Sequence, residues 1–179
     1  LSNKFDLNIE LSKNIKYRIL PSPHFELIDS KLYSNSNLKS EIVGDLKNMK
    51  IYISINKIYS QNNLEIKNIL FSKSVFNFNK DNIDFLISNL KKKPSKKIII
   101  KKSKFFFKDK DKTIVIFPIS HLIFNHNKKN HTNEVKLNGL AFNSKFYFNI
   151  VKEFKDEKKI NFNLKFPSAN LSFKNSITN

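Results

Sequence analysis

The chain of 179 residues contains no cysteine, no tryptophan and only two glycines. The absence of cysteine excludes a disulfide framework, a cysteine-ligated metal or iron–sulfur site, and a thiol nucleophile. Walker A loops, dinucleotide-binding turns and Gly-x-Ser-x-Gly elbows each need at least two neighbouring glycines, whereas this chain has only Gly44 and Gly139. The composition therefore argues against the common phosphate-loop enzymes and serine hydrolases.

Long apolar runs are also absent. No run approaches the ~20 apolar residues with which a helix crosses a bilayer, so the sequence predicts no transmembrane helix. Because the chain begins at Leu1 and not at Met, we expect an excerpt or a processed product, and a signal or anchor outside it is not excluded. The lack of cysteine agrees with an oxidising compartment.

Positive charge, in contrast, is abundant. The formal net charge is +18, from 33 Lys and Arg against 15 Asp and Glu, and Arg18 is the only arginine. Lys, Asn, Ile and Phe dominate and share A/T-rich codons, so we interpret most of this charge as codon bias. Lysine gives salt-sensitive attraction to phosphate with little base readout, and it attracts anionic lipid headgroups equally. The charge thus predicts the sign of a partner and not its identity.

Apolar and polar residues alternate along much of the chain. The alternation is clearest over residues 5–11, 51–55, 64–67, 76–78 and 160–166. A period of two, together with many Ile, Phe, Tyr and Val residues, predicts half-buried antiparallel strands with one apolar and one solvated face. We therefore predict a mostly β fold.

One segment has helical spacing. Ile83, Leu86, Ile87 and Leu90 follow a possible N-cap at Asp81, and basic residues and a proline come next. We expect one short helix near residues 81–92. The lysine-rich stretch 91–97 is a possible internal linker, but each half is too small to bury much core alone. We therefore expect a single domain over residues 1–179.

Two longer segments break the simple alternation. Residues 112–127 have apolar side chains at both parities, so we expect this strand in the middle of the sheet with both faces covered. Within residues 134–151 the apolar parity changes from odd, at Val135 and Leu137, to even, at Phe146 and Phe148. Gly139 lies at this change, which predicts a β-bulge or a tight bend there.

No catalytic or metal-binding constellation emerges from the sequence. His121, His126 and His131 are five residues apart, which places neighbours on opposite faces of a strand, whereas a metal needs converging ligands. The few carboxylates lie mostly beside lysines or in charged turns, and no strand–turn–helix context presents a Ser/His/Asp triad. We expect no metal, no cofactor, no catalytic residue and no enzymatic activity.

One stretch carries a resemblance to a known family. Ile19-Leu20-Pro21-Ser22-Pro23-His24-Phe25-Glu26-Leu27-Ile28-Asp29-Ser30 resembles the pattern with which AsmA-like domains begin. The strand–strand–helix order that follows, from about residue 49 to 90, is similar to that family, as are the later strands. These include Val135–Phe148, with Gly139 at the family's glycine position. The resemblance covers most of the chain from about Lys16, but Lys102-Ser103-Lys104 stands where the family usually has a glycine turn.

The resemblance implies a fold and a cellular role. AsmA-like proteins, with the related TamB-type and bridge-like lipid-transfer proteins, imply a long, curved antiparallel sheet that forms an open groove or taco-like half-barrel. The family implies a periplasmic protein of a Gram-negative-type bacterium, anchored in the inner membrane through a segment outside this sequence. Its implied role is phospholipid transport and outer-membrane assembly in the bacterial envelope.

An apolar sheet face also offers acyl chains a dry surface, at about 25 cal/mol per Å² of buried apolar area. Our first hypothesis is thus a non-enzymatic lipid-binding or lipid-transfer module whose partners are phospholipid acyl chains, with no specific nucleic acid expected. Two alternatives stay open, a basic β domain that binds nucleic acid and a purely structural envelope scaffold. The residues that we expect to line the lipid groove are Ile51, Ile53, Ile55, Leu64, Ile66, Phe76, Phe78, Phe146, Phe148, Ile150, Phe162, Leu164 and Phe166.

Overall fold

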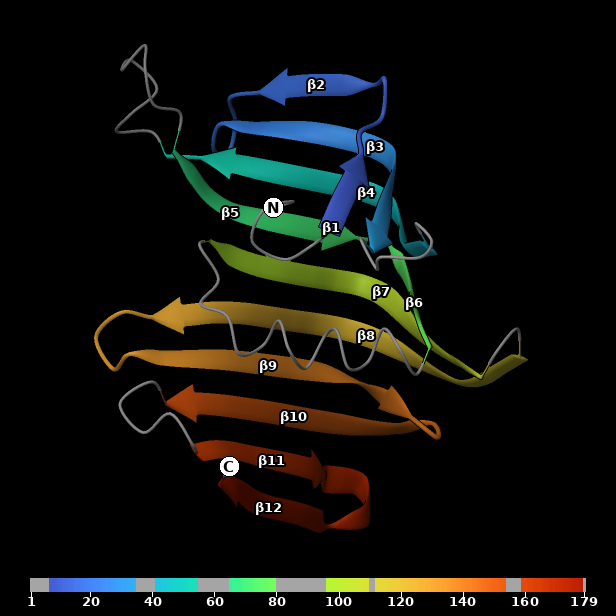
Figure 1. Cartoon of the computed structure of the whole chain (residues 1–179), viewed down its shortest axis with the longest axis vertical. Coiled ribbons are helices and arrows are strands. Elements are labelled where there is room, and N and C mark those ends of the chain that lie inside the picture. Colours follow the sequence, from blue (N-terminus) through green and yellow to red (C-terminus); the bar gives the residue numbers. More distant parts are fainter. Residues whose placement is uncertain are drawn as a thin grey trace.

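A computed structural model describes residues 7–34, 41–54, 65–79, 96–109, 112–153 and 159–178 of the chain. These residues form twelve strands of one sheet and a single 3-10 turn, Pro167–Ala169, without an α-helix (Figure 1). The first six strands are β1 (Leu7–Glu10), β2 (Ile15–Arg18), β3 (His24–Ser34), β4 (Glu41–Ile53), β5 (Ile66–Ser72) and β6 (Val75–Phe78). The other six are β7 (Lys97–Asp109), β8 (Lys112–Asn127), β9 (Thr132–Ala141), β10 (Ser144–Glu153), β11 (Lys159–Phe166) and β12 (Leu171–Thr178).

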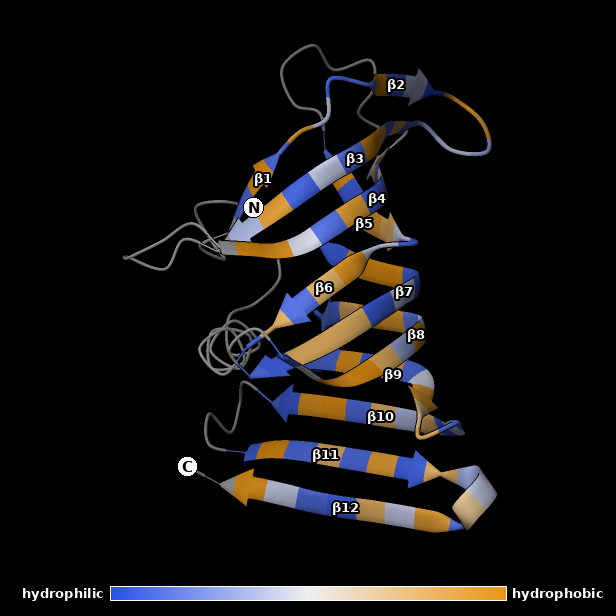
Figure 2. Cartoon of the chain, turned by 90° about the vertical axis from the view of Figure 1, so that its right-hand side faces the viewer, coloured by the Kyte–Doolittle hydropathy of each residue, from blue (hydrophilic) through white to orange (hydrophobic). Residues whose placement is uncertain are grey.

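The prediction of a mostly β chain is confirmed. Neighbouring strands follow the order β1-β3-β4-β5-β7-β8-β9-β10-β11-β12, with β2 beside β3 and β6 between β4 and β7. The sheet is not closed, because its first and last strands do not pair with each other, and Figure 2 shows the curvature of its strands. The predicted helix at 81–92 lies outside the described residues.

The sheet is mixed, so the expectation of a wholly antiparallel sheet is wrong at one place. β5 and β6 run parallel to β7, with Ile69 opposite Ile98 and Phe76 opposite Phe105. A parallel pair needs a crossover connection of about a dozen residues or more, and the segment between β6 and β7 is long enough for one. The sheet therefore continues from the first half of the chain into the second, on both sides of the possible linker.

A line of backbone irregularities crosses the middle of the sheet. Asp29 in β3, Lys73 between β5 and β6, and Lys102 in β7 have positive φ angles of 60°, 55° and 48°. The pairing of β8 with β9 also shifts between Ile119 and His121. The strand pairing places Lys73 opposite the region of Lys102 in β7. It places Lys102 in turn opposite the part of β8 where the register shifts. Each irregularity changes which alternate residues face the core, as a β-bulge does.

Two small buried serines form hydrogen bonds with backbone groups along this line of irregularities. The Ser74 amide donates a hydrogen bond to Ser103 Oγ at 3.1 Å, and Ser103 Oγ donates to the Lys101 carbonyl at 2.9 Å. Ser74 and Ser103 are 1% and 3% exposed, so a larger side chain has no room here. Specific hydrogen bonds and close packing thus hold the line of irregularities in place within the sheet.

The shift explains why residues 112–127 have apolar side chains at both parities. Phe117 and Ile119 precede the shift and Leu122 and Phe124 follow it, and all four belong to apolar clusters of one face. Ile114 and Ile116 are instead 69% and 46% exposed. The expectation that both faces of this strand are covered is therefore wrong at its start.

Gly139 is not itself a bulge, which corrects the prediction made for it. The β9–β10 register runs from Thr132 to Ala141 without a shift, and the irregularity lies in the facing strand β8. A Cβ on Gly139 would lie 2.6 Å from the Pro118 carbonyl oxygen, so glycine permits the close approach of β8. The parity changes instead at the turn residues Phe142 and Asn143, whose φ angles are 50° and 61°.

Candidate functional site

One face of the sheet carries an unbroken row of apolar side chains. Residues that are register partners across adjacent strands point to the same face, so successive pairs trace a row across the sheet. One such row crosses ten strands, from β2 to β12, without a polar residue. Its members are Ile15, Leu27, Met49, Phe71, Ile100, Leu122, Leu137, Phe148, Leu164 and Phe173.

A second row runs beside the first on the same face. It ends in β12 at Asn175, and its earlier members are Tyr17, Phe25, Ile51, Ile69, Ile98, Phe124, Val135, Ile150 and Phe162. We call the face that carries both rows the apolar face.

A chain of phenylalanine rings lies beside these rows. Its ring centroids are 5.4 Å apart for Phe78–Phe107, 5.5 Å for Phe107–Phe117, 6.0 Å for Phe117–Phe146 and 6.1 Å for Phe146–Phe166. These spacings are typical of edge-to-face and tilted aromatic contacts. The rings therefore extend the apolar surface from β6 to β11.

Exposure along the apolar face rises toward both ends. In the ten-residue row, Leu27 is 2% and Met49 0% exposed, whereas Ile15 at one end is 51% and Phe173 at the other is 54% exposed. Leu171 and Ile177 of β12 are also about half exposed, at 50% and 49%. The middle of the face is thus a core, and its two ends present apolar surface to solvent.

The structure brings the predicted groove residues together on this face. Ile51, Ile150 and Phe162 lie in the second row and Phe148 and Leu164 in the first. Phe76, Phe78, Phe146 and Phe166 belong to the ring cluster, and Ile53 pairs with Ile66, which packs on the main core. Ile55 and Leu64 lie outside the described residues.

Sequence reasoning missed much of the middle of the face. The row members that were not predicted are Leu27, Met49, Phe71, Ile100, Leu122 and Leu137 in its middle, and Ile15 and Phe173 at its ends. Ile100 precedes the line of irregularities and Leu122 follows it, so the simple alternation of apolar and polar residues is broken in both of their strands. The signal available in the sequence was Ser103 and Ser120, small polar residues that lie between the apolar runs of β7 and of β8.

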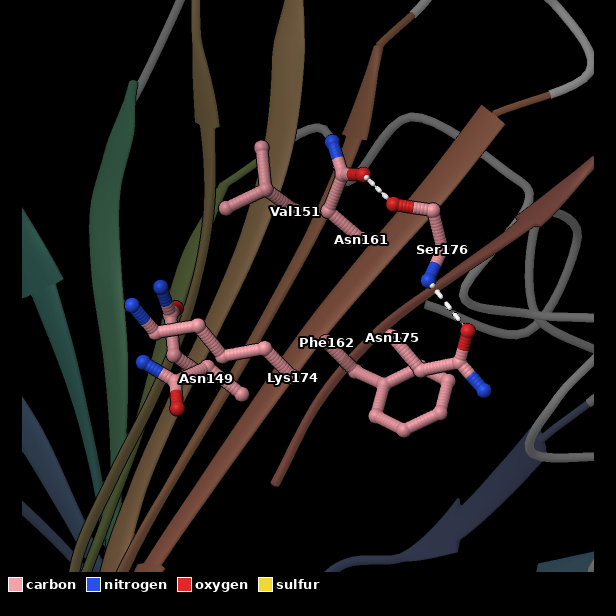
Figure 3. A pocket seen from close by; sticks show the side chains of 8 residues that line it. Asn149, Val151, Asn161, Phe162, Lys174, Asn175 and Ser176 are labelled. Atoms are coloured by element: carbon pink, nitrogen blue, oxygen red, sulfur yellow. Dashed lines mark hydrogen bonds between the residues drawn. The ribbon is translucent and has the colours of Figure 1, made fainter. Parts of the chain in front are cut away.

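The opposite face of the sheet is polar, and we call it the outer face. Over β8–β12 it holds two adjoining open depressions of about 540 and 440 Å³, which share Asn149 and Asn163. Figure 3 shows the smaller one, whose lining includes Asn149 and Lys174 and in which the Ser176 hydroxyl donates a hydrogen bond to Asn161 Oδ1. Their polar lining includes His121, Lys136, Asn138, Tyr147, Lys165 and Lys174.

The outer face is also where the structure places His121. Burial and the nearby Lys101 and Lys97 lower the pKa of His121 below its ordinary value. Among the described residues, no group of three His, Asp or Glu side chains is arranged to hold a metal ion.

A buried carboxylate anchors the outer face at the β2 end. Glu26 is 8% exposed and accepts hydrogen bonds from Arg18 at 3.0 Å and Asn48 at 2.9 Å, while Lys50 lies 3.3 Å away. The bonds from Asn48 and Arg18, aided by Lys50, lower the pKa of Glu26 from 4.5 to about 2. Glu26 therefore fastens β2 and β4 to β3 as a charged group.

Comparison with protein-family models, curated proteins and solved structures finds no match to this chain. Within the described ranges, no helix has the length and apolar character needed to cross a membrane.

Proposed function

We propose that the apolar face binds the acyl chains of phospholipids and that the protein is a non-enzymatic lipid-binding or lipid-transfer module. The observation that carries this proposal is the apolar row from Ile15 to Phe173, which is half exposed at both ends. The fold itself leaves the apolar side chains at these ends about half exposed, so they are accessible to a ligand.

The dimensions of the row suit a lipid. Its ten residues span nine inter-strand steps, which at about 4.8 Å each give a path of about 43 Å along the sheet. Because Leu27 to Ile100 are buried, the accessible part of the row is its partly exposed stretch from Leu122 to Phe173. These five residues span four inter-strand steps, about 19 Å, which exceeds the ~15 Å of hydrocarbon in one bilayer leaflet.

The energetics require no polar recognition of the chain. Burying a methylene group contributes about 0.8 kcal/mol, so six methylenes contribute roughly 5 kcal/mol before the entropic cost of binding. The positive charge of the protein favours anionic headgroups at the margins of the face. Such binding tolerates different acyl chains, as a transfer module requires.

We further propose that the protein acts in a bacterial envelope as an AsmA-like, inner-membrane-anchored periplasmic protein. The open curved sheet and the segment Pro21-Ser22-Pro23 ahead of β3 support this placement. Fractionation of the source cells into periplasm, inner membrane and cytoplasm tests it. Recovery of the protein in the cytoplasm would contradict it.

Uptake of a phospholipid with a fluorescent acyl chain tests the binding proposal. Wild-type protein is expected to bind the labelled lipid, and Phe173→Asp to weaken binding at least fivefold, because it places a charge in the apolar row. Phe173 is 54% exposed, so this variant is expected to fold.

Ser172→Asp is the matched control, since Ser172 neighbours Phe173 on the same strand and is the register partner of Lys165, on the outer face. It is expected to bind lipid like the wild type. Absence of uptake by the wild-type protein would favour a structural scaffold, and equal loss in both variants would show that net charge and not the apolar face controls binding.

A further inference from the structure

The two outer-face depressions have the composition of a ligand site. They lie over β8–β12, and most of their lining comes from the side of the sheet opposite the apolar face, with Phe148 and Phe162 as the exceptions that also belong to the apolar rows. The row Lys136, Asn149, Asn163 and Lys174 crosses four strands as consecutive register partners. The adjacent row places His121, Asn138, Tyr147 and Lys165 in the same order across β8 to β11.

The oxygens of the two shared amides, Asn149 Oδ1 and Asn163 Oδ1, are buried and have no hydrogen-bond partner in the described part of the chain. An unpaired buried acceptor is unfavourable, and no protein hydrogen bond to the oxygen opposes a half-turn of the amide. Each amide is therefore able to present either its NH₂ group or its oxygen to a ligand, which suits a partner that both donates and accepts.

The charge around the depressions is of one sign. Lys136, Lys165 and Lys174 line them, and no described carboxylate does. Glu134 forms an ion pair with Lys136 at 2.8 Å. Lys165 and Lys174 thus remain available to an anionic group.

An aromatic ring completes the larger depression. Tyr147 is 45% exposed and lies between Asn138 and Lys165 in its row. We propose that this outer-face site binds an anionic saccharide, a sugar of about disaccharide size that carries a phosphate group. The C–H face of a sugar ring packs on Tyr147, its hydroxyls bond to the asparagine amides, and its phosphate binds Lys165 and Lys174.

The site fits single-stranded nucleic acid less well. Proteins that bind single-stranded nucleic acid stack successive bases on several aromatic side chains along a basic groove. Here the described lining offers Tyr147 and the His121 imidazole on the outer face, with Asn138 between them in their row, and the cations are lysines, which provide point charges without the planar fork of arginine.

Titration of ¹⁵N-labelled protein with trehalose 6-phosphate, trehalose, inorganic phosphate and a 15-nucleotide oligo-dT tests the proposal. We expect the disaccharide phosphate to shift the side-chain amide signals of Asn138, Asn149 and Asn163, and to bind at least tenfold more tightly than trehalose or phosphate alone. Equal affinity for inorganic phosphate would overturn the proposal, because it would show only a cationic surface. Absence of binding, or tighter binding of oligo-dT, would overturn it as well.

Variants distinguish binding at this outer-face site from nonspecific attraction to the positive charge of the protein. Tyr147→Ala and Lys165→Ala are each expected to weaken binding of trehalose 6-phosphate at least fivefold. Lys145→Ala removes the same charge from an exposed position of β10 that lines neither depression, and it is expected to change affinity less than twofold. An equal loss in Lys145→Ala would contradict the site, and unchanged thermal unfolding midpoints exclude misfolding as the cause.

Discussion

At the scale of single residues, Glu26 and Gly139 place the most specific constraints on how neighbouring strands pack together. Glu26 is a buried carboxylate with three polar partners, and Gly139 leaves room for a neighbouring backbone carbonyl. Both act where strands must approach closely. Their effects are large because neither water nor a flexible side chain can replace what they provide.

Replacement of Glu26 by Gln tests the charged network. A folded-state pKa near 2, below the ordinary 4.5, means that ionised Glu26 stabilises the fold above about pH 4.5 and that this stabilisation is lost as pH falls toward 2. We expect Glu26→Gln to lower the free energy of unfolding by roughly 2–3 kcal/mol at pH 7, measured by urea denaturation. The gap between wild type and variant should shrink progressively from pH 4.5 to pH 2.

Asp29→Asn is the control for this prediction. Its ion pair with Lys47 is shorter, at 2.7 Å, but both side chains are 63% exposed. Exposed pairs contribute about 0–1 kcal/mol, and Asn tolerates the positive φ of residue 29. A larger loss for Asp29→Asn than for Glu26→Gln would contradict the assignment of Glu26 as the anchor.

Gly139→Ala tests the close approach of β8 to β9. The added methyl would meet the Pro118 carbonyl oxygen at 2.6 Å, and a backbone atom cannot rotate away, so we expect about 1–3 kcal/mol of destabilisation. At Gly44 the nearest atom is the Phe76 ring at 3.2 Å, so Gly44→Ala should cost less. Chemical denaturation measures both, and the reverse order would contradict this account of Gly139.

At the scale of strands, the line of irregularities determines which residues share a face. Lys73 and Lys102 hold left-handed backbone conformations that lysine rarely adopts, and the strands change face at these points. Because of this line, Ile98 and Ile100 on one side of it and Phe105 and Phe107 on the other all face the same apolar side of the sheet.

Lys102→Val tests the strain at this line. A β-branched residue at a φ of 48° is strongly disfavoured, so we expect about 1–2 kcal/mol of destabilisation although Lys102 is exposed. Lys104→Val, two residues further along the same strand and also exposed, should be neutral or slightly stabilising. Thermal unfolding compares the two, and equal effects would show that the backbone at Lys102 is not strained.

At the scale of the whole molecule, the fold class and the composition of the apolar face could be predicted from the sequence. Residues such as Phe162, Leu164 and Phe166 lie in strict alternation, which depends only on local pattern. The position of the irregularities could not be predicted, because Lys73 and Lys102 occupy conformations for which glycine or asparagine is the usual signal. The parallel pairing of β5 with β7 depends on a long-range crossover that no local pattern encodes.

The central claim is that acyl chains lie on the apolar face, and a paramagnetic lipid tests it most directly. The protein, with ¹³C-labelled Ile, Leu and Val methyl groups, is mixed with a phospholipid that carries a nitroxide in its acyl chain. We predict that the methyl signals of Leu137, Ile150 and Leu164 broaden, whereas those of the exposed outer-face residues Ile114 and Ile116 keep their intensity. Equal broadening of both sets, or none in Leu137, Ile150 and Leu164, would contradict lipid binding at this face.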